Sequence, residues 1–310
     1  MQTRSLGRTG LEVSALGFGC GPLGGHFGPF DKATSIAAVR HAIDRGINFF
    51  DTSPFYSRSE DVLGEALAGG FREKIVLCTK AGRNGPKDFD FSPKAMLASL
   101  NRSLARLGTD YVDVWFAHDV EFANDFEALF SETADAMRQA QRAGKCRFVG
   151  MTGYPPGLLA RAIERARLDV VLNYCHFSLT NSQLLTRLLP VAEQYGAGLV
   201  NASALMMGLF SRKGPPAWHS APQPFKDACR AVVELCQRRG ADAEVLALQY
   251  VLQQPRVPCT LVGMCTMAEV DTNLQALSMT MNAGLLAAAQ KLLAPFTDIE
   301  WGSGNWPKGQ

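Results

Sequence analysis

The sequence predicts a single domain over residues 1–310, built as an eight-stranded (β/α)8 TIM barrel. Short apolar or β-branched segments of strand length alternate eight times with amphipathic segments of helix length, and no low-complexity linker interrupts them. A doubly wound nucleotide-binding sheet alternates in the same way, but it needs a helix directly behind its first glycine-rich turn. The glycines at 17–21 are followed by no such helical pattern. A chain of 310 residues also exceeds the ~250 of a bare barrel, which leaves room for added loops.

We expect the first four strand–helix units in residues 15–142. The strands are expected at 15–18, 48–50, 75–79 and 111–116, and the helices at about 34–45, 60–67, 93–107 and 126–142. The third helix has the clearest boundaries, because Ser92 can cap its start, Pro93 suits its first turn and Gly108 can end it.

The second half of the chain repeats this pattern. Strands are expected at 147–150, 169–173, 198–201 and 259–262, and helices at about 157–167, 183–195, 225–239 and 243–253, with one more starting near Met267. Two segments lie outside the alternation. Residues 3–13 predict an N-terminal β-hairpin that closes one end of the barrel. Residues 213–225 form a long Pro-rich loop, which we expect on the C-terminal face, where such loops often bind substrate.

Charge and composition exclude two classes of protein. Thirty-one Lys and Arg against 29 Asp and Glu leave a net charge of +2, so we expect no nucleic-acid or membrane-surface partner. No apolar stretch reaches the roughly 18 residues of a membrane span, and the N-terminus lacks a signal-peptide core. The eight cysteines include no CxxC pair, which favours buried free thiols and no metal site. We expect a soluble, cytoplasmic enzyme that is a monomer or a weak homo-oligomer.

Polar side chains follow the second, third and fourth strands at the point where each strand ends. The second strand ends in Asp51, with Tyr56 five residues later. The third ends in Lys80 and the fourth in His118. Because barrel active sites lie at the carboxyl ends of the strands, we expect these four side chains to meet at one rim.

Together these four residues predict a proton-transfer site. A tyrosine hydroxyl has a pKa of ~10, and a neighbouring Lys80 ammonium would lower the pKa of Tyr56. Asp51 would hold Lys80 by an ion pair, and His118 would donate a hydrogen bond to the substrate oxygen. Each residue alone also fits a structural role, such as a helix cap for the Asp or a solvent-exposed end for the Lys. Their occurrence at successive strand ends favours the catalytic interpretation.

Over essentially its full length the chain resembles the aldo-keto reductase family. Residues 6–14 resemble the N-terminal hairpin of that family, and residues 46–53 and 107–113 resemble its most specific signatures. The resemblance implies that Asp51, Tyr56, Lys80 and His118 are the catalytic tetrad, with Tyr56 as general acid or base. It also implies a nicotinamide dinucleotide cofactor that is bound without a Rossmann domain.

The same resemblance implies nine cofactor contacts. They are Thr152, Gly153 and Asn173 at the carboxamide, Ser203 and Leu205 near the pyrophosphate, and Gly263, Thr266, Glu269 and Asn273 at the adenosine end. The family usually has an aromatic residue directly before the serine, to stack on the nicotinamide, where this chain has Ala202. NADP-preferring members carry Lys and Arg where Gly263 and Glu269 stand, so the sequence predicts NAD over NADP. Glu269 also fits a solvated helix residue.

Within the family, residues 27–29, 118–122, 174–177, 203–209, 214–219 and 301–304 resemble the aldose 1-dehydrogenase branch. This implies oxidation of the anomeric hydroxyl of a small-molecule sugar, L-galactose or a relative such as L-fucose, to the lactone. The substrate contacts would come from Phe27, His176, Trp218, His219 and Trp301. A loop-packing role fits His219 equally well. The sequence leaves open NADP-dependent reduction of aldehydes or ketones, and a nucleotide-binding regulatory subunit.

Overall fold

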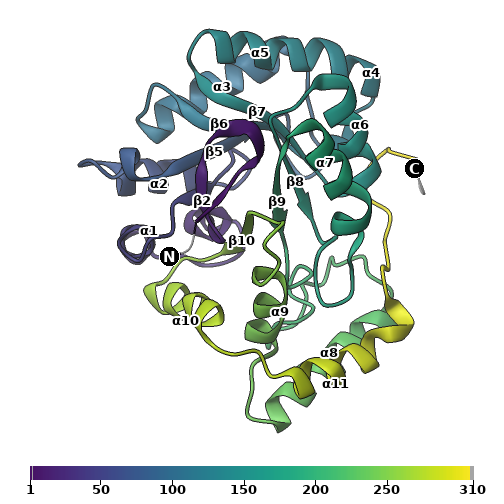
Figure 1. The fold of residues 1–310 in the computed structure, drawn as a ribbon. Coiled ribbons are helices and arrows are strands. Elements are labelled where there is room, and N and C mark those ends of the chain that lie inside the picture. Colours follow the sequence, from purple (N-terminus) through teal and green to yellow (C-terminus); the bar gives the residue numbers. More distant parts are fainter. Residues whose placement is uncertain (2, 308–310) are drawn as a thin grey trace.

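Eight parallel strands form a closed barrel in the computed structural model, which describes Met1 and residues 3–307. The strands are β3 (Leu16–Gly19), β4 (Phe49–Asp51), β5 (Val76–Ala81), β6 (Val112–Ala117), β7 (Cys146–Gly153), β8 (Val170–Tyr174), β9 (Gly198–Ala202) and β10 (Cys259–Gly263). They pair in chain order, and β10 pairs with both β9 and β3 to close the barrel. The predicted (β/α)8 fold is confirmed (Figure 1).

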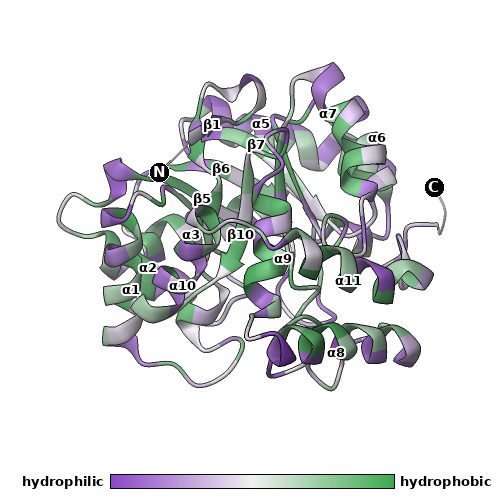
Figure 2. Ribbon diagram, turned by 60° about the horizontal axis from the view of Figure 1, so that its bottom comes forward, coloured by the Kyte–Doolittle hydropathy of each residue, from purple (hydrophilic) through white to green (hydrophobic). Residues whose placement is uncertain are grey.

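Helices surround the barrel. They are α1 (Lys32–Asp44), α2 (Ser59–Leu67), α3 (Pro93–Leu107), α4 (Phe126–Ala128), α5 (Ala134–Arg142), α6 (Pro156–Ala166), α7 (Leu189–Tyr195), α8 (Gln223–Arg238), α9 (Ala243–Leu252), α10 (Met267–Ser278) and α11 (Ala283–Leu293). Figure 2 shows hydrophobic residues concentrated on the strands and hydrophilic residues on many outward helix turns. Among the described helices, none is long and apolar enough to cross a membrane. All eight cysteines are free thiols, and seven of them are buried.

The predicted hairpin consists of β1 (Thr3–Ser5) and β2 (Glu12–Ser14), which pair antiparallel. Leu6, Leu11 and Val13 are buried together with side chains of the barrel interior. Gly7 has a φ of +55°, and a Cβ there would lie 2.4 Å from the backbone nitrogen of Gly198, at the start of β9. The hairpin therefore closes the N-terminal end of the barrel, as predicted.

Several predicted boundaries differ from the structure. The helices expected at 126–142 and 183–195 each contain a π-helical turn, Leu129–Thr133 and Leu184–Leu188. The first helix starts at Lys32 rather than near residue 34, because the Asp31 carboxylate accepts a hydrogen bond from the backbone N–H of Thr34. The Pro-rich loop is shorter than predicted, since α8 begins at Gln223.

Helix α11 was not predicted. It packs against α8, and Figure 1 shows the two helices side by side at one edge of the barrel. Their buried side chains, which include Phe225 of α8, belong to a second apolar cluster. This cluster also contains Phe210, and Trp301 packs against it. This cluster supports the loop after β9 and the C-terminal tail from residue 300 onward.

Candidate active site

The structure brings the four predicted catalytic side chains together at the carboxyl ends of β4, β5 and β6. The Lys80 ammonium donates to the carboxylate of Asp51, to the Thr52 carbonyl at 2.9 Å and to the Tyr56 hydroxyl at 3.3 Å. The ring centroids of Tyr56 and His118 lie 5.6 Å apart, at nearly right angles. Because β4, β5 and β6 are hydrogen-bonded neighbours, their ends meet at one rim, and this is what assembles the site.

Burial and charge act in opposite directions on Tyr56. Burial raises the pKa of Tyr56 to about 12, and the nearby Lys80 ammonium opposes that rise without cancelling it. Lys80 lowers the pKa of Tyr56, as expected from the sequence, but burial has the larger effect. The Tyr56 hydroxyl of the free protein is therefore protonated near neutrality. Burial lowers the pKa of Lys80, but the charges of Asp51 and Tyr56 outweigh it and raise that pKa overall. The lysine is therefore a permanent cation beside the tyrosine.

His118 is held neutral with one defined donor. Its Nδ1 lies 3.0 Å from the hydroxyl of Ser53, and that hydroxyl oxygen accepts from the backbone N–H of Phe55. The Ser53 hydroxyl proton can therefore point at Nδ1, which places the imidazole proton on Nε2. Burial, followed by the charges of Lys80 and Arg83, lowers the pKa of His118 well below its ordinary value. His118 thus offers an N–H donor that does not change charge near neutrality.

The residues expected at the carboxamide are close to one another at the ends of β7 and β8. The Asn173 amide donates to the carbonyls of Gly153 and Tyr154 at 2.9 and 2.8 Å. Its Oδ1 is buried without a hydrogen-bond partner, which suits an incoming amide N–H. The Thr152 hydroxyl is already engaged, since it accepts from the backbone N–H of Asp119 at 2.9 Å and donates to the Asp119 carboxylate at 3.3 Å.

Comparison with known proteins identifies the family of this chain. The model of the aldo/keto reductase family matches residues 15–293. The chain belongs to the aldo/keto reductase family. It is 40% identical to L-galactose dehydrogenase of Arabidopsis thaliana, over 98% of each chain. It is 26% identical to D-threo-aldose 1-dehydrogenase of a Pseudomonas species, over 90% of this chain and 93% of that one.

A solved structure agrees on the fold. An aldo-keto reductase of Bacillus halodurans in its holo form superposes with a TM-score of 0.79 at 24% identity, covering 99% of this chain and 100% of the other. Because the chain shares its family with these dehydrogenases, it is an oxidoreductase that acts on CH–OH groups. Members of the aldo/keto reductase family use a nicotinamide cofactor.

At the predicted adenosine end, Glu269 is part of a helix cap. Thr266 is the N-cap of α10, and the Glu269 carboxylate accepts from the backbone N–H groups of Cys265 and Thr266 at 2.7 and 3.0 Å. This capping box fixes the carboxylate at the helix start, one turn before the half-buried Asn273. Gly263, the last residue of β10, is exposed there.

The predicted pyrophosphate residues follow β9 in a strained turn. Ser203 has a φ of +58°, and the nearby Met206 and Met207 both have a φ of +51°. Leu205 packs partly buried between the two main apolar clusters. This segment therefore has a backbone shape that the strand pattern of the sequence does not encode.

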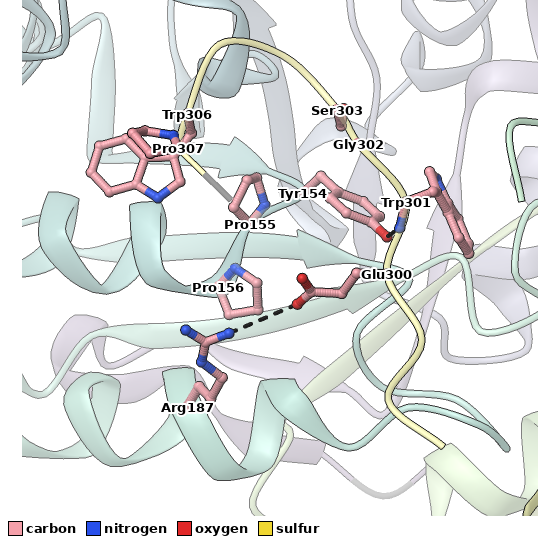
Figure 3. Close-up of a pocket in the computed structure, with 10 residues that line it drawn as sticks. All are labelled: Tyr154, Pro155, Pro156, Arg187, Glu300, Trp301, Gly302, Ser303, Trp306 and Pro307. Carbon is pink, nitrogen blue, oxygen red and sulfur yellow. Dashed lines mark hydrogen bonds and ion pairs between the residues drawn. The ribbon is translucent and has the colours of Figure 1, made fainter. Parts of the chain in front are cut away.

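The five predicted substrate residues separate into two groups. Phe27 is 61% exposed and meets the edge of His26, whose ring lies 5.5 Å from that of Tyr56. The other four form a chain of ring contacts through Tyr154. His176 lies 4.3 Å and Trp301 5.5 Å from Tyr154, His219 lies 5.1 Å from Trp301, and Trp218 stacks on His219 at 6.3 Å. Figure 3 shows Tyr154 and Trp301 in the pocket under the C-terminal tail.

Both predicted histidines, His176 and His219, make contacts within the protein. Nε2 of His219 lies 3.0 Å from the Met206 carbonyl, and Nδ1 accepts from the backbone N–H of Ala221. Both ring nitrogens therefore hold the Pro-rich loop that carries Trp218 in place. His176 is fully buried, with Nδ1 3.0 Å from the Tyr174 carbonyl and Nε2 3.7 Å from Glu300. Of this group, Trp218 is the most exposed, at 66%.

Sequence reasoning assigned no role to three titratable residues, Arg83, Asp119 and Glu121. Arg83 forms an ion pair with Asp119 and lies over the ring of Phe55 at 3.8 Å. Glu121 is fully buried, accepts from the Tyr174 hydroxyl at 2.6 Å and from the Ser303 hydroxyl at 3.2 Å. Burial, together with the charge of Asp119, raises the pKa of Glu121 to about 8. Two signals were available in the sequence. Arg83 and Asp119 closely follow Lys80 and His118 in the chain, and the segment 118–122 that resembles the aldose 1-dehydrogenase branch contains Asp119 and Glu121.

Proposed function

We propose that this protein oxidises the anomeric hydroxyl of an aldose, L-galactose or a relative such as L-fucose, to the corresponding lactone with NAD. The observation that carries the proposal is the contact of the Lys80 ammonium with the Tyr56 hydroxyl, beside a neutral His118. The 40% identity to L-galactose dehydrogenase over 98% of the chain supports the sugar class.

In this mechanism Tyr56 and His118 divide the work at the substrate oxygen. Nε2–H of His118 donates to the C1 hydroxyl oxygen and positions it. The Tyr56 phenolate, stabilised by Lys80, accepts the proton of that hydroxyl as the C1 carbonyl forms. Asp51 keeps Lys80 pointed at the phenol through their ion pair. A bound oxidised nicotinamide would supply the hydride acceptor for C1.

The chain offers suitable partners for such a cofactor. The buried Oδ1 of Asn173 can accept from the carboxamide N–H, which gives that orphaned oxygen a partner. At the adenosine end, the Glu269 carboxylate would repel a 2′-phosphate, whereas it can accept hydrogen bonds from a ribose hydroxyl. This charge favours NAD over NADP.

The exposed aromatic residues suit a sugar. The C–H faces of a pyranose can stack on rings, and Phe27 and Trp218 expose large aromatic surfaces on the loops after β3 and β9. The Phe55 ring lies 4.6 Å from the His26 ring and 6.0 Å from the His118 ring. We therefore assign Phe27, Phe55 and Trp218 to the substrate pocket, and His176, His219 and Trp301 to its support.

The test is a spectrophotometric assay at 340 nm with a panel of free sugars, each with NAD and with NADP at equal concentration. We expect reduction of NAD with L-galactose or L-fucose, and a lower kcat/KM with NADP. Efficient reduction of aldehydes with NADPH but no sugar oxidation would favour the reductase function instead. Tight nucleotide binding without turnover of either kind would favour a regulatory subunit.

A further inference from the structure

A second cavity lies behind the catalytic tyrosine, between α3 and the loops that follow β4 and β5. Its volume is about 190 Å³. It is lined by Pro54, Ser57, Arg83, Asn84, Ser99, Arg102 and Arg106. These residues supply three guanidinium groups, two hydroxyls and an amide, and no carboxylate is part of the lining. Such a set of donors suits an anion.

One face of α3 supplies three of these residues. Ser99, Arg102 and Arg106 are spaced by three and four positions, so they lie on the same side of the helix. Arg83 and Asn84 reach the cavity from the opposite side, on the loop after β5. Cationic groups from two separate elements thus converge on one space.

Two of the three arginines are already held in place. Arg106 donates from Nε to the Glu60 carboxylate at 2.7 Å, and Glu60 is itself buried and accepts from the Thr79 hydroxyl at 2.6 Å. Arg83 is fixed by its ion pair with Asp119 and by the Phe55 ring. Because these side chains are ordered before any ligand arrives, little conformational entropy is lost on binding.

Arg102 is the charge that remains uncompensated. Its side chain is exposed, and it makes no hydrogen bond or ion pair with another residue of the described chain. The pairs Arg83–Asp119 and Arg106–Glu60 are each neutral overall, so the third guanidinium gives the cavity a net positive charge. An anion would neutralise this net charge. It would also accept hydrogen bonds from the guanidinium N–H groups that Asp119 and Glu60 leave free.

We propose that this cavity binds a phosphate group, either inorganic phosphate or the phosphate of a small monoester. Guanidinium forks match the oxygens of phosphate in bidentate pairs, which neither water nor a neutral sugar can reproduce. On the same measure of volume one water molecule needs only ~10–15 Å³, so a cavity of about 190 Å³ has room for a tetrahedral anion. The site is separate from the predicted cofactor contacts, which follow β7 to β10. Since Pro54 and Ser57 flank Tyr56 in the chain, a bound phosphate lies beside the loop that carries the catalytic tyrosine.

The experiment is isothermal titration calorimetry at low ionic strength, with and without saturating NAD. Inorganic phosphate and fructose 6-phosphate are titrated separately into the wild-type protein, Arg102→Gln and Arg142→Gln. We expect saturable one-site binding that NAD does not displace. Loss of a charged hydrogen-bond donor in Arg102→Gln should weaken the affinity for phosphate at least about tenfold. Arg142, exposed on α5 without an ion pair among the described residues, is the matched control and should bind like wild type.

The two ligands distinguish the sources of phosphate. Binding of inorganic phosphate alone identifies a free-anion site, and binding of both identifies a site for monoesters. Absence of saturable binding for both ligands overturns the proposal, as does displacement of the ligand by NAD. Equal affinity in wild type and Arg102→Gln also overturns it, and so does a loss of affinity in Arg142→Gln as large as that in Arg102→Gln. Because Arg102 is exposed, its replacement leaves the core intact, and a thermal melt verifies the fold. The titration with inorganic phosphate contains no sugar, so its result is independent of the proposed function.

Discussion

Replacing Lys80 with Met removes the charge that lies 3.3 Å from the Tyr56 hydroxyl. At an effective dielectric constant of about 20, two unit charges at this separation attract by about 5 kcal/mol, or about 3.7 pKa units. The net effect is smaller, because Asp51 opposes Lys80 in the wild type and would take up a proton once its partner is gone. We expect the pKa of Tyr56 to rise by about 2–3 units, which lowers the phenolate fraction at a given pH by about 10²- to 10³-fold.

The assay is the initial rate of sugar oxidation at 340 nm between pH 7 and 9, at saturating NAD. In both proteins the phenolate is the minor form, so both rates should rise with pH while their ratio stays constant. Lys94→Met, an exposed lysine at the start of α3, is the control and should behave like wild type. A Lys80→Met protein that keeps more than a tenth of the wild-type rate would contradict the role assigned to Lys80. So would a loss of rate that is fully explained by weaker NAD binding.

Three further predictions follow from the same contacts. Tyr56→Phe should lower the oxidation rate by about 10²- to 10⁴-fold while calorimetry shows unchanged NAD affinity, and normal turnover would mean that another group carries the proton. Since burial raises the pKa of Tyr56 to about 12, the active phenolate is favoured as pH rises, so wild-type oxidation should increase from pH 7 to 9; a rate that falls over this range would contradict that assignment. Gly304 has a φ of +69°, and a Cβ there would lie 2.2 Å from the Glu121 carbonyl, so Gly304→Ala should detach the tail and speed its proteolysis, whereas unchanged cleavage would mean that the tail is held elsewhere.

A fifth prediction concerns the choice of cofactor. Glu269→Lys should raise the ratio of kcat/KM for NADP to that for NAD, because it replaces a repulsive charge near a 2′-phosphate with an attractive one. It should also lower the melting temperature, since the capping box of α10 is lost. A lower melting temperature with an unchanged cofactor ratio would restrict Glu269 to its capping role.

The barrel and the positions of the four tetrad residues follow from local patterns in the chain. Strand-length and helix-length segments alternate, and parallel strands that pair in chain order bring their carboxyl ends to one rim. Asp51, Lys80 and His118 stand at such ends, so their meeting could be predicted without coordinates. The capping of α3 by Ser92 and Gly108 was equally local and is present in the structure.

The surroundings of these four side chains depend instead on how distant parts of the chain pack together. The hydrogen bond from the Ser303 hydroxyl to the Glu121 carboxylate joins residues 182 positions apart, and no periodicity in the chain encodes it. The cationic cavity likewise depends on how one face of α3 meets the loop of Arg83. The pKa of Tyr56 depends on burial, a property of the whole packed site, and burial outweighed the nearby charge from which the sequence argument started.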